Sequence, residues 1–284
     1  MSGAAEVPRD QKAPVDLRAL LRTASNSTPG VAGASRSLTS DLSIDEELAL
    51  HAVGYEPVEL VCGTSIHSVP FGAWNWGVGE IHYASDAYAR SFSAAIKRMH
   101  EECAGAGGHG VVGVEIERRV SSHHITVELT GTAIRPVGAP RISAAEVFVS
   151  DLSGRDFSLL STAGWMPLGL ASGASYVYAP RRSAGAVLKQ SSQNVELTNF
   201  TEAMYAARET AMERMQAQAL AMKGTGVVDV KVVEGPLPFA KHAIGFSAYG
   251  TVVHLVADQH RNMTPLLALS LDDAAVSFEA RNLG

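Results

Sequence analysis

The chain has little cysteine, few aromatic residues and no long apolar run. Its two cysteines, Cys62 and Cys103, form no C-x-x-C pair, so we expect reduced thiols without a disulfide framework. Roughly 18 consecutive apolar residues are needed to cross a bilayer, and no segment comes near that length. The N-terminus also lacks a basic segment followed by an apolar one. We therefore expect a cytoplasmic protein without a membrane span.

Positive charge is scarce as well. A formal net charge of −6 leaves no cationic field to attract phosphate backbones, so nucleic acid is not an expected partner. Hydrophobic residues make up 46% of the 284 residues, which is enough for substantial cores. These numbers predict a chain of about two compact domains.

What the chain does contain is an internal duplication. The motif Ser-Asp-Leu-Ser at residues 40–43 recurs 110 positions later, and the spacing of Leu, Gly and Pro that follows it recurs in the same register. Two further matched pairs lie downstream: Gly108–Val114 with Gly224–Val230, and Gly131-Thr132 with Gly250-Thr251. Self-similarity of this kind indicates two copies of one unit. We call residues 39–138 the first repeat and residues 141–258 the second repeat.

Segments of different composition flank the repeats. Residues 1–38 are rich in proline and serine around one short amphipathic stretch, and we interpret them as a flexible arm that could dock on a partner. Residues 259–284 form a C-terminal tail, in which residues 265–271 could add an edge strand.

The same order of elements is predicted in both repeats. A capping box at Ser43–Glu46 starts a short helix that ends near Gly54, and a strand over residues 58–62 then ends in a turn at Gly63–Ser65. A long helix follows, with an apolar stripe from Tyr88 to Cys103, and a hairpin of two strands closes the unit. In the second repeat the long helix is expected to be capped at Asn199, and an insertion at 234–239 should lengthen the hairpin loop. The fold class is therefore α+β, with two tandem β-α-β-β two-layer units, each preceded by a short capped helix.

Burial within one such unit is incomplete. Three strands and one helix leave one face of the sheet uncovered. The long helix of the second repeat also carries a second apolar line, which contains Tyr205, Met212 and Leu220. One side of this helix should cover its own sheet, and the other could meet another helix of the same chain or of a neighbour.

These patterns resemble the YbjQ family of small proteins, which is labelled heavy-metal-binding. The resemblance covers residues 40–136 and 150–256, and it rests on glycines and valines at Gly63, Gly108–Val114 and Gly131–Ile134 with their second-repeat counterparts. It implies a β-α-β-β fold similar to the dodecin subunit. It also implies a homo-oligomer, in pentameric or double-pentameric rings.

The heavy-metal label directs attention to the thiols and imidazoles. His100, Cys103 and His109 form the closest local cluster, and Cys62 with His67 is a second candidate. A divalent transition or heavy metal ion is the cofactor that such ligands would bind. The alternative is that Cys103 and Cys62 are small core residues, because each lies on the apolar phase of its element.

Catalytic motifs are missing from the sequence. There is no Gly-x-Ser-x-Gly, no P-loop lysine and no H-E-x-x-H, and the Ser-Asp-Leu-Ser motifs are interpreted as helix caps. We therefore predict a protein that is not an enzyme.

One loop is peculiar to the first repeat. It contains Phe71, Trp74, Trp76 and Tyr83 among several glycines, and the second repeat has no such aromatic cluster. We interpret it first as an interface, second as a cap on the core and third as a ligand pocket. The sequence as a whole predicts a self-assembling, ring-forming protein. The alternative is a heavy-metal or small-ligand binding module that uses the first repeat.

Overall fold

Two sheets, each covered by one long helix, make up the part of the chain that the structure describes. This computed structural model describes residues 39–69, 79–121, 123–179, 197–237 and 240–261. Contacts group the described residues into one unit. The α+β fold class is confirmed. The predicted arm at 1–38 and the edge strand at 265–271 lie outside the described residues.

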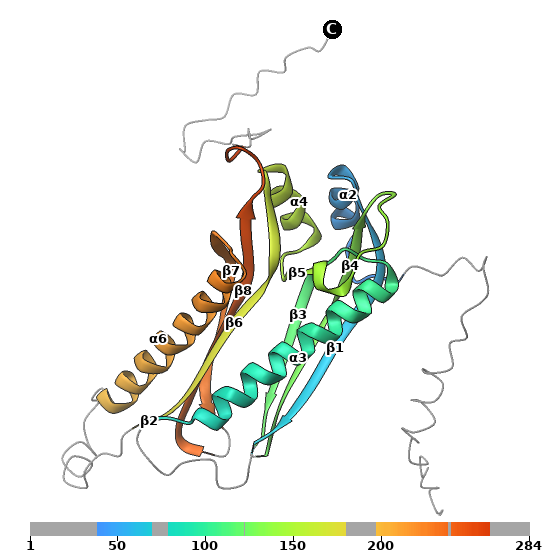
Figure 1. The fold of residues 1–284 in the computed structure, drawn as a ribbon. Coiled ribbons are helices and arrows are strands. Elements are labelled where there is room, and N and C mark those ends of the chain that lie inside the picture. Colours follow the sequence, from blue (N-terminus) through green and yellow to red (C-terminus); the bar gives the residue numbers. More distant parts are fainter. Residues whose placement is uncertain (1–38, 70–78, 122, 180–196, 238–239, 262–284) are drawn as a thin grey trace, which may run out of the picture. The chain divides into compact units, whose positions relative to one another are not determined.

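The order helix, strand, helix, strand, strand occurs twice along the chain (Figure 1). The first half contains α2 (Ile44–Ala52), β1 (Tyr55–Ser68), β2 (Gly79–Glu80), α3 (His82–Ala106), β3 (Gly110–Val120) and β4 (His124–Pro136). The second half contains the 3-10 turn η1 (Ala144–Glu146), β5 (Phe148–Val149), α4 (Gly154–Thr162), β6 (Trp165–Tyr178), α6 (Thr198–Ala221), β7 (Gly226–Leu237) and β8 (Ala240–Leu255).

The three long strands of each sheet have the same order, and the fourth, short strand lies at opposite edges of the two sheets. The first sheet runs β1-β4-β3-β5 and the second runs β2-β6-β8-β7. Pairing within each half is antiparallel, whereas β5 adds to β3 in parallel. Each sheet therefore contains one two-residue strand from the other half of the chain: β5 joins the first sheet and β2 joins the second.

Capping sets the bounds of the short helices. The Glu46 carboxylate accepts the Ser43 backbone N–H at 2.8 Å, which completes the predicted capping box. Gly54 has a φ of +81°, a left-handed conformation that favours glycine and ends α2. Gly164 plays the same part after α4, with a φ of +87°.

The prediction of a turn at Gly63–Ser65 is wrong. Strand β1 continues through Gly63 to Ser68. A Cβ atom on Gly63 would lie 2.2 Å from the backbone oxygen of Ala95, so this glycine lets α3 approach the sheet closely. Gly173 allows the same approach of α6, at 2.0 Å from the oxygen of Ala211.

Two details of the second repeat also differ from the prediction. Helix α6 is capped by Leu197, without a side-chain hydrogen bond, and not by Asn199. The insertion at 234–239 extends the hairpin strands, because β7 reaches Leu237 and β8 begins at Ala240. Residues 238 and 239 lie outside the described part of the chain.

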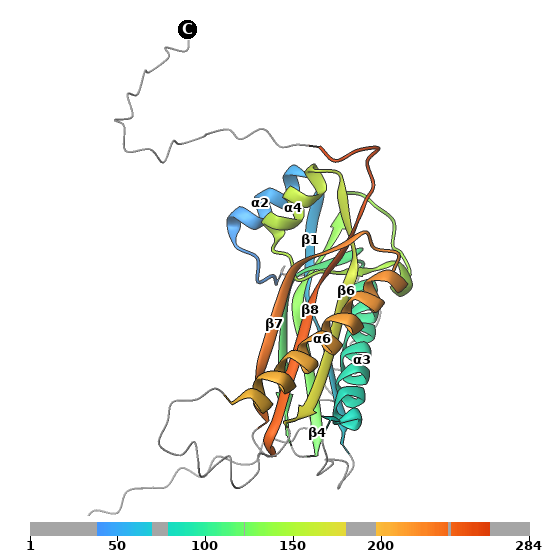
Figure 2. The ribbon, with the colours of Figure 1, turned by 90° about the vertical axis from the view of Figure 1, so that its left-hand side faces the viewer.

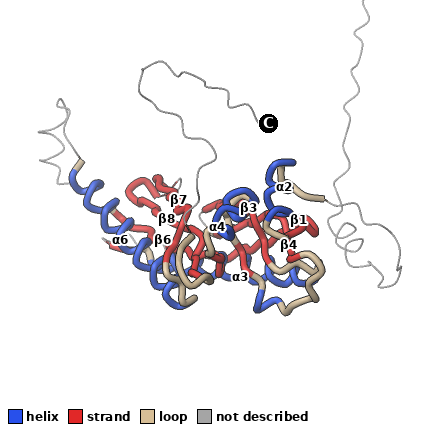
Figure 3. The backbone as a smooth tube through the Cα atoms, turned by 90° about the horizontal axis from the view of Figure 1, so that it is seen from above, coloured by secondary structure: helices blue, strands red, loops and turns tan. Residues whose placement is uncertain are grey.

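Each long helix covers its own sheet. Helix α3 packs on β1 and β4, and α6 packs on β6 and β8. Seen from above, α6 lies beside the second sheet, on the side away from α2 and β1 (Figure 3). Helix α3 differs from α6 because it also contacts β6 of the other sheet. The short helices α2 and α4 pack against each other (Figure 2).

Candidate functional site

The first two residues of the second Ser-Asp-Leu-Ser motif bind a buried threonine. The Thr251 hydroxyl donates to the Asp151 carboxylate at 2.5 Å and accepts the Asp151 backbone N–H at 3.1 Å. The Ser150 hydroxyl lies 3.0 Å from the same oxygen. These bonds fasten the segment before α4 to β8.

The first repeat has the same arrangement in a more open setting. The Thr132 hydroxyl donates to the Asp41 carboxylate and accepts the Asp41 backbone N–H at 3.3 Å. The Ser40 hydroxyl lies 3.5 Å from it. Asp151 is buried, whereas Asp41 is exposed. We call each of these Ser-Asp-Thr clusters a clamp. The two clamps differ in their access to water.

Helix capping accounts for only half of each motif. Ser43 and Ser153 cap α2 and α4 as predicted, and Ser153 accepts the Asp156 backbone N–H at 3.1 Å. The role of the preceding Ser-Asp pair was missed in the sequence. The available signal was the recurrence of a Gly-Thr pair in each repeat.

The leading segment of the second repeat then joins the first sheet. The Phe148 backbone N–H donates to the His109 oxygen at 3.3 Å, and that of Ser150 donates to the Val111 oxygen at 2.9 Å. The Phe148 ring lies over Gly110, where a Cβ would come within 2.1 Å of it. Gly110 is thus required for this contact.

Strand β2 makes the reciprocal connection. Glu80 forms an ion pair with Arg214 of α6, with 3.0 Å between Oε2 and Nη2, and accepts the Ser85 hydroxyl at 2.6 Å. Burial disfavours the charged carboxylate, but the hydrogen bonds from Arg214 and Ser85 outweigh it and lower the pKa of Glu80. A charged group of the first repeat is therefore fixed on the helix of the second.

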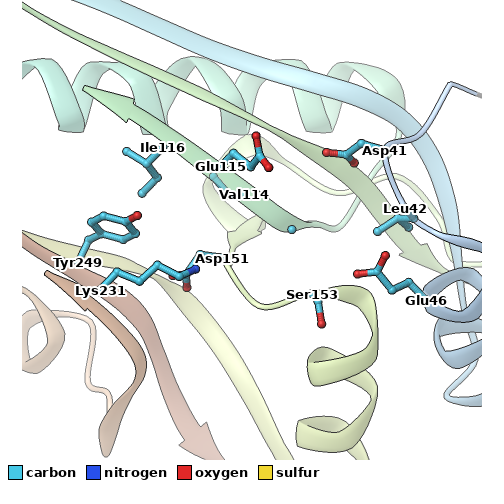
Figure 4. Close-up of a pocket in the computed structure, with 11 residues that line it drawn as sticks. Asp41, Leu42, Glu46, Val114, Glu115, Ile116, Asp151, Ser153, Lys231 and Tyr249 are labelled. Atoms are coloured by element: carbon cyan, nitrogen blue, oxygen red, sulfur yellow. The ribbon is translucent and has the colours of Figure 1, made fainter. Parts of the chain in front are cut away.

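A pocket of about 530 Å³ opens where the two sheets meet, beside the starts of α2 and α4 (Figure 4). Its lining is mainly acidic or apolar and includes Asp41, Leu42, Glu46, Val114, Glu115, Ile116, Asp151, Ser153, Lys231 and Tyr249. The Lys231 amine lies 3.2 Å from the Asp151 carboxylate and 3.1 Å from that of Asp229. Because burial is outweighed by these carboxylates, the pKa of Lys231 is raised. This lysine is arranged as an ion-pair partner and not as a nucleophile, which would need a lowered pKa.

Asp151 is the buried member of this pair. Burial raises its pKa, and the bonds from Thr251 and Lys231 offset that effect only in part. An acid whose folded-state pKa is raised favours folding below its unfolded pKa and disfavours it as the pH rises through the folded pKa.

We expect Lys231→Met to lower the free energy of unfolding by about 1 to 2 kcal/mol at pH 7, because the buried Asp151 carboxylate loses its cation. The loss should shrink towards zero near pH 4, since the protonated acid needs no partner. Urea denaturation between pH 4 and 8 measures this difference. Lys97→Met is the matched control, because the ion pair of Lys97 with Glu101 is exposed to solvent and its atoms are 3.9 Å apart. A loss that stays constant down to pH 4 would indicate lost packing instead.

The predicted metal ligands do not converge. Cys103 is buried, its Sγ lies 3.5 Å from the Gly110 oxygen, and burial raises the pKa of its thiol to about 12. Nε2 of His109 lies 2.7 Å from the Pro140 oxygen, and burial lowers the pKa of His100. Within the described ranges, no group of three or more His, Cys, Asp or Glu side chains is placed to hold a metal ion.

The second candidate pair lies on opposite faces of β1. Cys62 and His67 are five positions apart in one strand, and an odd spacing puts side chains on different faces. Cys62 is exposed, while Nδ1 of His67 is 3.1 Å from the Ser91 hydroxyl on the α3 side. These two residues are therefore not joint ligands of one ion.

Most of the aromatic loop lies outside the described residues, which include neither Phe71 nor Trp74 nor Trp76. Tyr83 lies in the first turn of α3 and is exposed. The interface role of this loop stays a prediction.

Comparison with known proteins gives two matches. The encapsulin nanocompartment protein Rv1762c of Mycobacterium tuberculosis (strain ATCC 25618 / H37Rv) is 32% identical over 246 residues, which cover 84% of this chain and 94% of the relative. The YbjQ family model, described as "Putative heavy-metal-binding", matches residues 181–256. A YbjQ-like domain is thereby confirmed in the second repeat. None of the helices in the described part is long and apolar enough to cross a membrane.

Proposed function

The chain belongs to the family of the Mycobacterium tuberculosis encapsulin nanocompartment protein Rv1762c, and from this premise we propose that it is a non-enzymatic protein that assembles with copies of itself in a nanocompartment. The observation that carries the proposal is a relation that spans 84% of this chain and 94% of the relative. It therefore concerns the complete two-sheet arrangement and not one shared domain.

The surface of the second repeat supports self-assembly. Helix α6 covers its own sheet with one face, and the apolar side chains of Leu197, Met204 and Leu220 are left exposed beside that face. Apolar side chains gathered on one face of a helix are typical of a protein contact. A neighbouring chain on this face would bury α6 on its second side, as the sequence led us to expect.

The finer features of the proposal follow from the resemblance to YbjQ proteins. We propose that residues 39–138 and 141–258 are two dodecin-like units, that the assembly is a ring of five chains in the cytoplasm, and that the arm at 1–38 binds a partner. The equal order of the three long strands in the two sheets supports the proposal of two units.

Native mass spectrometry tests self-assembly. We expect the purified protein to be found at a multiple of its 29.9 kDa chain mass, and at five times that mass for a pentameric ring. The single-chain mass alone, over the micromolar range and at physiological salt, would refute self-assembly.

A second candidate function is favoured by the description of the matching family model, which names heavy metals. The match lies in the second repeat, whereas His100, Cys103 and His109 lie in the first. Elemental analysis of the purified protein, with Cys103→Ser beside it, tests this function. A metal near one equivalent per chain that Cys103→Ser abolishes would support it, and no metal in either sample would end it.

A further inference from the structure

We propose that copies of this chain join head to tail, through a repetition of the contacts that hold its own two repeats together. In this arrangement the second repeat of one copy receives the first repeat of the next. The inference rests on the self-assembly proposed above and names the surfaces that carry it.

The contact inside the chain buries the second face of α3. Ile81, Tyr88 and Phe92 are buried in one cluster that also contains Leu170 and Tyr176 of β6. The Ile81 backbone N–H donates to the Tyr176 oxygen at 2.6 Å. The second sheet thus covers a helix that already has its own sheet on the other side.

The same positions of α6 are exposed. Gly63 lies against Ala95 of α3 as Gly173 lies against Ala211 of α6, so α6 matches α3 with a shift of 116 residues. Ile81 corresponds to Leu197, which is 42% exposed, and Tyr88 corresponds to Met204, which is 39% exposed. Phe92 corresponds to the exposed, charged Arg208. The second sheet covers the second face of α3. Nothing in the described part of the chain covers the equivalent face of α6.

The complementary surface is the outer face of the first sheet. Leu170, Ser172 and Tyr176 are the β6 residues on the side that meets α3, and all are buried. Their counterparts 110 residues earlier are Leu60, Cys62 and Ile66 on β1. Ile66 is 64% exposed and Cys62 is exposed, so this sheet face is open where its equivalent is covered.

The edge strands show the same contrast. The Phe148 ring occupies the space beside Gly110 of β3, where a side chain would lie. At the corresponding Gly226 of β7, a built Cβ has only Val253 within 4 Å, at 3.9 Å. Val111 and Val112 of β3 are buried beneath the incoming segment, but Val227 and Val228 of β7 are half-exposed. Strand β7 therefore keeps an open place of the kind that β5 fills on β3.

The segment that would fill this place belongs to the first repeat. By sequence, Thr39 corresponds to Val149 and precedes the Ser-Asp clamp in the same way. Within the chain, Ser40 and Asp41 are hydrogen-bonded to Thr132 of their own sheet, and Leu42 packs against the cluster that contains Phe148 and Phe157. Docking on β7 of a neighbour would enclose the exposed Asp41 as Asp151 is enclosed.

Each chain therefore carries both halves of the contact on different surfaces. Such a contact is heterologous, and its repetition closes a ring or builds a filament. The two contacts are not chemically identical. Inside the chain, Arg118 donates to Ser247 at 2.6 Å, whereas the counterparts of these two residues are Glu234 and Glu128. We expect the contact between chains to be weaker than the one inside the chain.

Two charge substitutions test the proposal, one on each surface. Ile66→Asp blocks the outer face of the first sheet, and Met204→Asp blocks α6. The matched controls are Val137→Asp, 61% exposed, and Tyr205→Asp, 65% exposed and next to Met204. The counterparts of both control positions, Val256 and Ala89, are exposed in the other repeat, so neither control lies in the contact.

Native mass spectrometry should show single chains for Ile66→Asp and for Met204→Asp, and wild-type assemblies for both controls. Circular dichroism confirms that each variant is folded. Because each blocked variant keeps the surface that the other lacks, an equimolar mixture should give one-to-one dimers that grow no further. A contact between identical surfaces would instead let the variant that keeps that surface dimerise alone.

Thiol labelling gives a second measurement, because it reports the accessibility of Cys62 on the proposed surface. Cys103 is buried in either state, whereas Cys62 should react at least tenfold more slowly in assembled wild type than in Ile66→Asp. Equal rates would overturn the proposed surface. Wild-type protein found only as single chains would refute self-assembly itself, whereas assembly that both blocked variants retain would refute the head-to-tail contact alone.

Discussion

Replacement of Gly173 by alanine is expected to lower the free energy of unfolding by about 3 kcal/mol or more, which is at the upper end for an overpacked core. The new Cβ would lie 2.0 Å from the Ala211 oxygen and 2.7 Å from the Met215 nitrogen. Both are backbone atoms of α6, so the contact can be relieved only by a shift of the whole helix away from β6. Urea denaturation, followed by circular dichroism, measures the loss.

Gly235→Ala is the control for this experiment. Gly235 also lies in a strand of the second sheet, but no atom lies within 4 Å of its built Cβ. We expect a change within about 1 kcal/mol, because only the backbone entropy differs. Equal losses in both variants would show that the close approach of α6 is not the cause. Gly63→Ala should resemble Gly173→Ala, since its Cβ would lie 2.2 Å from the Ala95 oxygen.

The glycines also show what the sequence could and could not predict about the fold. Helix caps such as Ser43 with Glu46 are local, so their partners can be identified from spacing alone. Gly63 looked like a turn because a glycine after an alternating run is the usual end of a strand. Its actual role depends on Ala95, which is distant in sequence and comes close only once α3 packs on the sheet.

The exchange of short strands lay beyond sequence reasoning for a similar reason. Strands β2 and β5 have two residues each, which is too few to show an alternating pattern. Their positions are set by long-range partners: Tyr176 and Arg214 hold the segment around β2, and Gly110 receives Phe148 of β5. The duplication predicted two similar units, but not how one unit completes the other.

The candidate metal site illustrates how burial decides between two interpretations of one residue. His100 and Cys103 have the spacing of neighbours on a helix, and the same spacing puts Cys103 on the apolar stripe of α3. Desolvation raises the pKa of this thiol to about 12, so the thiolate that a metal needs is disfavoured. The Ser-Asp pairs carried the more useful signal, because they recur together with Thr132 and Thr251.

Removal of the Thr251 hydroxyl is the second change with a large expected effect. Thr251→Val keeps the shape of the side chain but removes the donor to the Asp151 carboxylate and the acceptor of its backbone N–H. Both groups are buried, and a buried polar group without a partner costs about 1 to 3 kcal/mol. We therefore expect a loss of about 3 kcal/mol in the free energy of unfolding, measured by urea denaturation at pH 7.

Thr132→Val is the matched control, because Thr132 is equally buried and makes the equivalent bonds to Asp41. Asp41 is exposed in the single chain, so water can replace the lost hydroxyl, and we expect a loss of only about 1 kcal/mol. The comparison should be made in the Ile66→Asp background, where chains stay separate. Equal losses there would show that solvent access does not set the strength of the two clamps. In the assembling protein, enclosure of Asp41 by a neighbour should bring the loss for Thr132→Val close to that for Thr251→Val.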